Sequence, residues 1–208
     1  NYVASLLEMG GSVGAAFLDV STGEFWLSQE EGPQAWGAMF NNLAHFGPRE
    51  LIVPEQFADQ YLSQMPEDLR SQFVDTRQPD WTFHSDYSRR ALLDHFGVTT
   101  LECFGVNGED AAIAAAGSLL GYARETQKTT LAHIVSLRLF EPGRYLKLDA
   151  TTVSNLELVR GLDGNRTWTL LTTIDLTRTG MGARLLRSWV LRPSLDRLEI
   201  EFRLDAVE

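Results

Sequence analysis

The first fifty residues alternate between segments typical of strands and one typical of a helix, which limits the folds open to the chain. Residues 13–20 read Val-Gly-Ala-Ala-Phe-Leu-Asp-Val and predict a buried strand, and a Ser-Thr-Gly turn then leads to a hairpin partner at 24–28. Pro33 opens a predicted helix whose apolar residues keep a 3.6-residue period, and 51–53 is a short apolar strand. This alternation predicts an α/β sheet.

The following residues continue the same pattern up to a predicted domain boundary near residue 130. Helices are expected at 57–64, 87–96 and 111–124, with a brief strand at 73–74 and a loop at 77–82. The third helix is rich in alanine and is expected to close the first domain. Residues 129–144 are expected to be a connector, after which the pattern is helical to the end of the chain.

Composition is ordinary for a globular protein, with 44% hydrophobic and 22% charged residues among 208. No apolar run approaches the roughly 20 residues that span a bilayer, and no secretory leader is visible, so we expect a cytoplasmic protein. The first residue is Asn1 and the last, Glu208, falls inside a helical pattern, so we expect a piece of a longer protein. The single cysteine, Cys103, is expected to be a small core residue.

Charge is divided unevenly along the chain. The net charge of −10 belongs to residues 1–145, which hold 9 basic and 19 acidic residues, whereas residues 146–208 hold nine of each. An acidic surface repels the phosphate backbone of nucleic acids. The first domain is therefore expected to bind a protein partner rather than DNA.

The densest sequence pattern lies between residues 177 and 189. Thr179 is placed to cap a helix, and Met181, Leu185 and Trp189 follow at helical spacing on one face, with Arg184 on the opposite side. The stretch from 178 to 192 contains four arginines and no acidic residue, which suits phosphate or carboxylate partners. The alternative interpretation is an amphipathic helix with a solvated arginine face.

Four patterns in this half of the chain, taken in order, resemble the core of the MutS family of DNA mismatch-repair proteins. They are Asn-Leu-Glu-Leu at 155–158, Thr-Leu-Leu at 169–171, Thr-x-Met-Gly-x-Arg-Leu-Leu-Arg-x-Trp at 179–189 and Arg-x-x-Ala-Val at 203–207. Gly180 stands where many members carry proline, and Ser194 separates a Pro-Leu pair that the family usually has directly. The residues that carry the resemblance are Asn155, Leu156, Glu157, Leu158, Thr179, Met181, Gly182, Arg184, Leu185, Trp189 and Arg203.

The resemblance implies two domains. Residues 1–130 would be the connector domain, an α/β domain similar in fold to ribonuclease H, and residues 131–208 would be an all-α segment, the N-terminal part of the helical core or lever domain. In the family, the parent protein is a homodimer that clamps mismatched DNA and uses ATP and Mg to recruit MutL. The connector relays conformational change between the mismatch-binding and ATPase domains and docks MutL.

The resemblance implies no catalytic residue, cofactor or metal in the chain itself, because the family's ATPase lies in another domain. No Gly-x-x-x-x-Gly-Lys-Ser/Thr phosphate loop occurs, and the four histidines and one cysteine have no zinc spacing. A relay needs a hinge, and the candidates are Gly161, Gly164 and the pair Gly180 and Gly182. The other interpretation of these glycines is as ordinary helix-end residues.

Two alternative functions remain open at this point. A metal-dependent ribonuclease H-like nuclease could use Asp19 on the first predicted strand, with Glu8, Asp75 or Asp110 as further carboxylates. Otherwise Asp19 is a strand-end residue that caps the turn at 21–23. The second alternative is an acidic interaction module unrelated to repair, in which the ordered motifs would be a coincidence.

Overall fold

The chain folds into two compact units, residues 1–140 and 141–208. The structure is a computed structural model, and it describes residues 2–128, 131–141, 143, 145, 146, 148, 150–162, 164, 165 and 167–206. Among the described residues, no helix is both long enough and apolar enough to cross a membrane.

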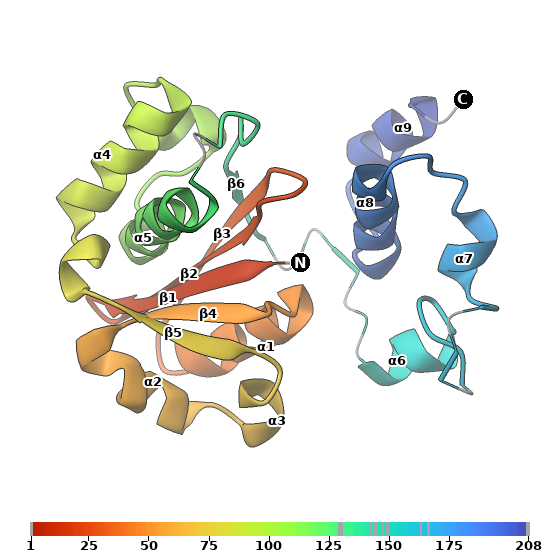
Figure 1. The fold of residues 1–208 in the computed structure, drawn as a ribbon, viewed down its shortest axis with the longest axis horizontal. Coiled ribbons are helices and arrows are strands. Elements are labelled where there is room, and N and C mark those ends of the chain that lie inside the picture. The colour runs from red at the N-terminus through yellow and green to blue at the C-terminus, as the bar shows by residue number, and fades with distance from the viewer. Residues whose placement is uncertain are drawn as a thin grey trace. The chain divides into compact units, whose positions relative to one another are not determined.

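A six-stranded mixed sheet forms the centre of the first unit, with the strand order β5-β4-β1-β2-β3-β6 (Figure 1). The strands β1, β2 and β3 form an antiparallel meander, whereas β4 pairs parallel with β1, β5 with β4, and β6 with β3. The strands are β1 (Val3–Met9), β2 (Ser12–Asp19), β3 (Glu24–Glu31), β4 (Glu50–Pro54), β5 (Val74–Gln78) and β6 (Arg138–Leu139). The predicted α/β sheet is therefore confirmed.

Helices cover both faces of this sheet (Figure 1). On β2, Ala16 and Leu18 belong to the same core cluster as residues of α5 (Asp110–Gln127), while Phe17 between them stacks on Phe46 of α1 (Ala35–Phe46) with ring centroids 4.0 Å apart. Successive side chains of a strand point to opposite faces, so α5 and α1 lie on opposite sides. The first unit is thus a three-layer α/β arrangement.

The other helices of this unit are short or peripheral. They are α2 (Ala58–Gln64), α3 (Glu67–Arg70) and α4 (Ser85–Phe96), with 3₁₀ turns at Glu55–Phe57, Asp80–Phe83 and Leu101–Phe104. The predicted helices at 57–64 and 87–96 are confirmed, and Gly97 ends α4 in the left-handed region with φ 64°. The predicted loop at 77–82 is wrong, because residues 77 and 78 complete β5 and a 3₁₀ turn begins at Asp80.

The alanine-rich helix α5 approaches its neighbours closely at two glycines. A Cβ added to Gly14 of β2 would lie 2.2 Å from the backbone of Ala111, and one added to Gly117 of α5 would lie 2.3 Å from Cα of Ser88 in α4. Real Cβ atoms do not approach other atoms so closely, so glycine is required at both places. Small residues thus let α5 pack between the sheet and α4.

The first unit continues past the boundary expected near residue 130, a position outside the described residues, and ends at Phe140. Leu131, Ile134 and Leu137 are only 1%, 2% and 1% exposed and belong to the same core cluster as α5. The next two residues form β6 beside β3. Residues 131–140 therefore belong to the sheet domain rather than to the helical segment.

Cys103 corrects a third expectation. It is exposed, in the 3₁₀ turn Leu101–Phe104, and its Sγ contacts the carbonyl oxygen of Thr100 at 3.3 Å. Leu101, two residues earlier, is the buried member of this turn. The apolar neighbours of Cys103 suggest a core position for it, but in this turn Leu101 occupies the core and Cys103 faces solvent.

The described part of the second unit contains four helices. They are α6 (Ala150–Asn155), α7 (Leu170–Ile174), α8 (Gly180–Leu191) and α9 (Arg197–Asp205). An isolated antiparallel bridge joins Tyr145 to Ser194, where the amide of Leu146 donates to the carbonyl of Pro193 at 2.9 Å. None of the described residues of α7, α8 or α9 is classed as buried.

Candidate functional site

The Asn-Leu-Glu-Leu motif joins α6 to α7. Asn155 is the last residue of α6, and Leu156 is 58% exposed, while Leu158 is buried. The carbonyls of Glu157 and Leu158 accept hydrogen bonds from the first amides of α7, at 3.1 Å from Leu170 and 2.9 Å from Leu171. The first two motifs of the sequence are therefore in direct contact.

Glu157 makes this junction possible through its backbone and its side chain. Its φ of 48° lies in the left-handed region, where residues other than glycine are uncommon. Its Oε1 accepts a hydrogen bond from the amide of Leu162 at 2.8 Å. At the other side of the junction, Thr169 and Thr172 form a reciprocal capping box at the start of α7.

Thr179 caps α8 as the sequence predicts, because its Oγ1 accepts a hydrogen bond from the amide of Gly182 at 3.0 Å. Gly180 and Gly182 lie in the first turn of the helix. A Cβ on Gly182 would lie 3.2 Å from Oγ1 of Thr179 and 3.4 Å from Cβ of Thr177, whereas one on Gly180 would meet only a guanidinium nitrogen of Arg184, at 3.9 Å. Gly182 is therefore the more constrained of the two.

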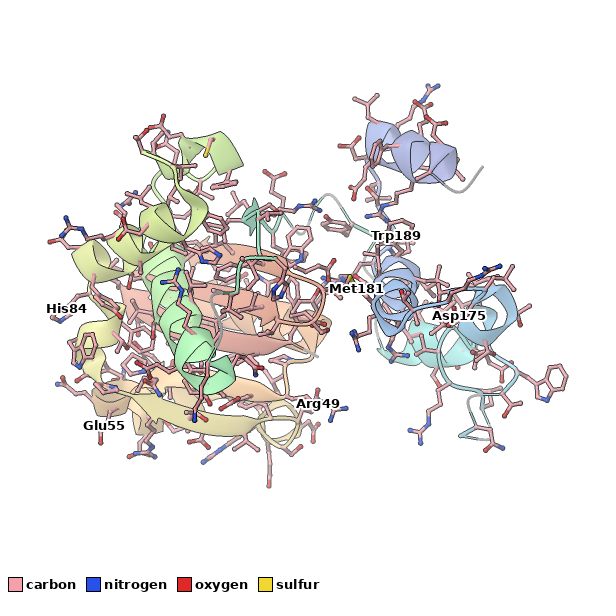
Figure 2. All side chains as sticks on the ribbon, turned by 45° about the horizontal axis from the view of Figure 1, so that its top comes forward. Arg49, Glu55, His84, Asp175, Met181 and Trp189 are labelled. Carbon is pink, nitrogen blue, oxygen red and sulfur yellow. The ribbon has the colours of Figure 1, made fainter. Side chains whose placement is uncertain are left out.

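Met181, Leu185 and Trp189 follow one another at four-residue steps along α8, and Met181 and Trp189 both project from that helix (Figure 2). Met181 is 56% exposed, and Leu185 and Trp189 are half-buried. The guanidinium of Arg203 in α9 lies 4.8 Å from the centroid of the Trp189 ring and pairs with Glu199. The third and fourth motifs thus meet through a cation–π contact.

Arg184 and Arg187 are exposed, as expected for the arginine side of α8. Just before this helix, Asp175 accepts hydrogen bonds from the hydroxyl and the amide of Thr177, at 2.6 and 3.0 Å. These bonds lower the pKa of the Asp175 carboxyl below its ordinary value. Val207, the last residue of the fourth motif, lies outside the described residues.

Asp19 occupies the end of β2 and is 4% exposed. Its Oδ1 accepts a hydrogen bond from the amide of Ser21 at 2.9 Å, and its carbonyl accepts from the amides of Thr22 and Gly23. Burial acts to raise the pKa of this carboxyl, but hydrogen bonds, among them those from Ser21, outweigh it, and the pKa is lowered. The side chain therefore serves the turn at 21–23.

The surroundings of Asp19 give no support to the nuclease alternative within the described residues. No group of three or more His, Cys, Asp or Glu side chains that could hold a metal ion occurs in the part of the chain that the structure describes. Glu8, Asp75 and Asp110 stand on β1, β5 and α5, and none of them joins Asp19 in such a group.

The signature residues thus form junctions between helices, with hydrogen bonds, caps and one cation–π pair. Such junctions can fix the angles between helices. Sequence reasoning missed the place of residues 131–140 in the first unit, because their apolar residues follow neither the 3.6-residue period of a helix nor the two-residue period of a strand. Their only signal is a three-residue spacing of Leu131, Ile134 and Leu137.

Comparison with known proteins gives the family. Residues 1–135 match the family model of MutS domain II, and residues 151–208 match that of MutS domain III. The DNA mismatch repair protein MutS of Pelotomaculum thermopropionicum is 40% identical over 100% of this chain and 24% of its own length. The proteins of the same name from Protochlamydia amoebophila and Solibacter usitatus are 38% and 40% identical, again over 100% of this chain and 24% of theirs.

The chain therefore spans about a quarter of the length of these curated relatives. Both family models match in the order in which the two units occur, and together they cover most of the sequence. The chain belongs to the MutS family.

Proposed function

We propose that this chain is the connector domain and the first part of the core domain of a MutS-type DNA mismatch-repair protein. The observation that carries the proposal is the match to MutS domains II and III, in order, along one chain whose relatives are named DNA mismatch repair protein MutS. The mixed sheet, with an antiparallel meander followed by parallel strands, supports a ribonuclease H-like connector. The helices α6–α9 support an all-α core segment.

The proposed role is a relay of conformational change between the mismatch-binding and ATPase domains of the parent protein. A relay needs rigid bodies that move as units. The first unit suits this role, because helices cover both faces of its sheet and α5 packs too closely for a Cβ at Gly14. Gly180 and Gly182, at the start of α8, are the proposed hinge.

The proposed partner of the first unit is MutL. The acidic balance of residues 1–145 disfavours contact with a phosphate backbone and favours a protein surface. The parent protein would act in the cytoplasm as a homodimer on mismatched DNA. Its ATP and Mg would be bound by a separate ATPase domain, and the chain described here would be non-catalytic.

The docking role can be tested by titrating the 208-residue chain with the ATPase domain of MutL and, in parallel, with mismatched duplex DNA at physiological salt. We expect saturable binding of MutL and little affinity for DNA. Metal-dependent DNA affinity without MutL binding would contradict the proposal and favour the nuclease alternative.

The hinge can be tested in the full-length parent protein with Gly182→Val, since a β-branched residue crowds Thr179 and stiffens the first turn of α8. We expect a weaker dependence of ATP turnover on mismatched DNA. Gly37→Val is the matched control, because Gly37 also lies in a helix but has nothing within 4 Å of an added Cβ. Unchanged coupling in Gly182→Val would refute the hinge.

A further inference from the structure

Residues 131–140, here called the exit segment, leave α5 and run to the end of the first unit. Leu131, Ile134 and Leu137 enter the core, as described above, and the amide of Phe140 donates to the carbonyl of Leu27 at 2.6 Å. The guanidinium of Arg138 lies 5.6 Å from the centroid of the Trp26 ring. The end of the exit segment is thus attached to the sheet at β3.

Two histidines attach the beginning of this segment to neighbouring elements. Nε2 of His95, on α4, lies 2.9 Å from the carbonyl oxygen of Ile134. Nε2 of His133, in the segment itself, lies 2.5 Å from the carbonyl oxygen of Val20, which follows β2. A carbonyl oxygen can only accept, so in both rings Nε2 carries the proton and donates.

The other nitrogen of His95 determines its charge. Nη2 of Arg124, on α5, lies 2.8 Å from Nδ1 of His95. A guanidinium can only donate, so Nδ1 must offer a lone pair and the His95 ring must be neutral. The His95 ring, which belongs to α4, therefore links three elements. It accepts a hydrogen bond from Arg124 of α5 and donates one to Ile134 of the exit segment.

We propose that the exit segment is a proton-sensitive latch, in which the hydrogen-bonded chain from Arg124 through His95 to Ile134 is complete only while the His95 ring is neutral. A proton on Nδ1 removes the acceptor of Arg124 and places two positive groups within hydrogen-bonding distance. Arg124 must then turn away, so α5 loses its link through His95 to the exit segment, although Nε2 of the protonated ring can still donate to Ile134. The inference concerns the chain itself and does not depend on the relay proposed above.

The electrostatic surroundings of His95 agree with this geometry. Burial lowers the pKa of the His95 ring. Two charged or titratable groups, Arg124 from α5 and His133 from the exit segment, lower this pKa further. The hydrogen bond to Ile134 opposes them in part. A lowered pKa means that the opened segment binds the proton more readily than the closed one, so opening increases as the pH falls below about 6.5, the ordinary value for histidine.

Hydrogen exchange of the 208-residue chain between pH 7.5 and 5 tests the latch, after correction for the intrinsic effect of pH on exchange. The reporters are the amides of Ile134 and Phe140, which are hydrogen-bonded to Leu131 and Leu27. We expect their opening, relative to amides of β2, to increase by up to about tenfold for each pH unit below 6.5.

The variant His95→Gln should abolish this pH dependence. Glutamine can donate to Ile134 and accept from Arg124, but it does not titrate. His84→Gln is the matched control, because His84 is an exposed histidine before α4 whose loss should leave the wild-type profile unchanged (Figure 2). A pH dependence in His95→Gln equal to that of the wild type would overturn the proposal.

A second measurement needs no variant. The ¹⁵N shifts of the His95 ring report which nitrogen carries the proton. We expect protonated Nε2 and bare Nδ1 at pH 7, and a titration below the ordinary value for histidine. The opposite tautomer, or a ring that titrates at or above that value, would also overturn the latch.

Discussion

Gly14 is a residue at which the first unit has no room for added volume. A methyl group there would lie 2.2 Å from the backbone of Ala111, which cannot move aside as a flexible side chain could. We expect Gly14→Ala to lower the free energy of unfolding by about 2 kcal/mol or more. Urea denaturation measures the change, and Gly37→Ala is the control, since an exposed helical glycine should gain about 0.5 kcal/mol. Equal midpoints for both variants would contradict this packing.

Ser5 is a buried polar residue whose hydroxyl has no hydrogen-bond partner among the described residues. It lies on the central strand β1 and is fully buried, with its hydroxyl unsatisfied. Since an unsatisfied buried hydroxyl costs about 1–3 kcal/mol, Ser5→Ala should stabilise the chain, by about 1 kcal/mol. The melting temperature checks this expectation. A clear decrease would mean that the hydroxyl is bonded in solution.

At the scale of single elements, the start of α5 depends on a side chain from the sheet. Its own N-cap residue, Glu109, makes no capping bond through its side chain, and Oε1 of Gln29 in β3 instead accepts from the amides of Ala111 and Ala112, at 3.0 and 3.3 Å. We expect Gln29→Ala to cost about 0.5–2 kcal/mol, the effect of losing an N-cap. Denaturant unfolding measures it. Gln60→Ala, at an exposed position of α2, is the control and should be nearly neutral.

Elements with a strong local signal could be predicted from the sequence. The helix α1 has a clear apolar period, α5 has helix-forming alanines, and α8 has a capping threonine, and all three form as expected. The sequence pattern does not identify the strand β1, although β1 lies between β4 and β2 in the sheet. Its apolar run is short, and a turn of two glycines with φ of 61° and 85° separates it from β2. Its role depends on distant partners in the sheet.

The candidate site likewise contains some features that the sequence predicts and others that it does not. The capping role of Thr179 follows from residue type and spacing, and the structure confirms it. The contact between Arg203 and Trp189 joins two helices, and the hydrogen bonds from Leu170 and Leu171 to the first motif join residues more than ten positions apart. Spacing alone cannot predict such pairs, because they depend on how separate helices are placed.

At the scale of the whole molecule, the position of the domain boundary makes a quantitative prediction. Leu131, Ile134 and Leu137 bury apolar surface in the core of the first unit. Full burial of one such side chain contributes about 1.5–3 kcal/mol, so the three together contribute about 5–9 kcal/mol as an upper estimate. This is comparable with the total stability of a typical domain, about 5–15 kcal/mol.

A chain shortened to residues 1–140 should therefore fold cooperatively, whereas residues 1–130 should be largely unfolded. Residues 1–135 should lie between them, because they keep Leu131 and Ile134 but lose Leu137 and the strand β6. Near-ultraviolet circular dichroism and urea denaturation of the three chains would give the order of stability. If residues 1–130 were as stable as 1–140, the exit segment would contribute no net stability, and the boundary near residue 130 expected from the sequence would be the better description of the first domain.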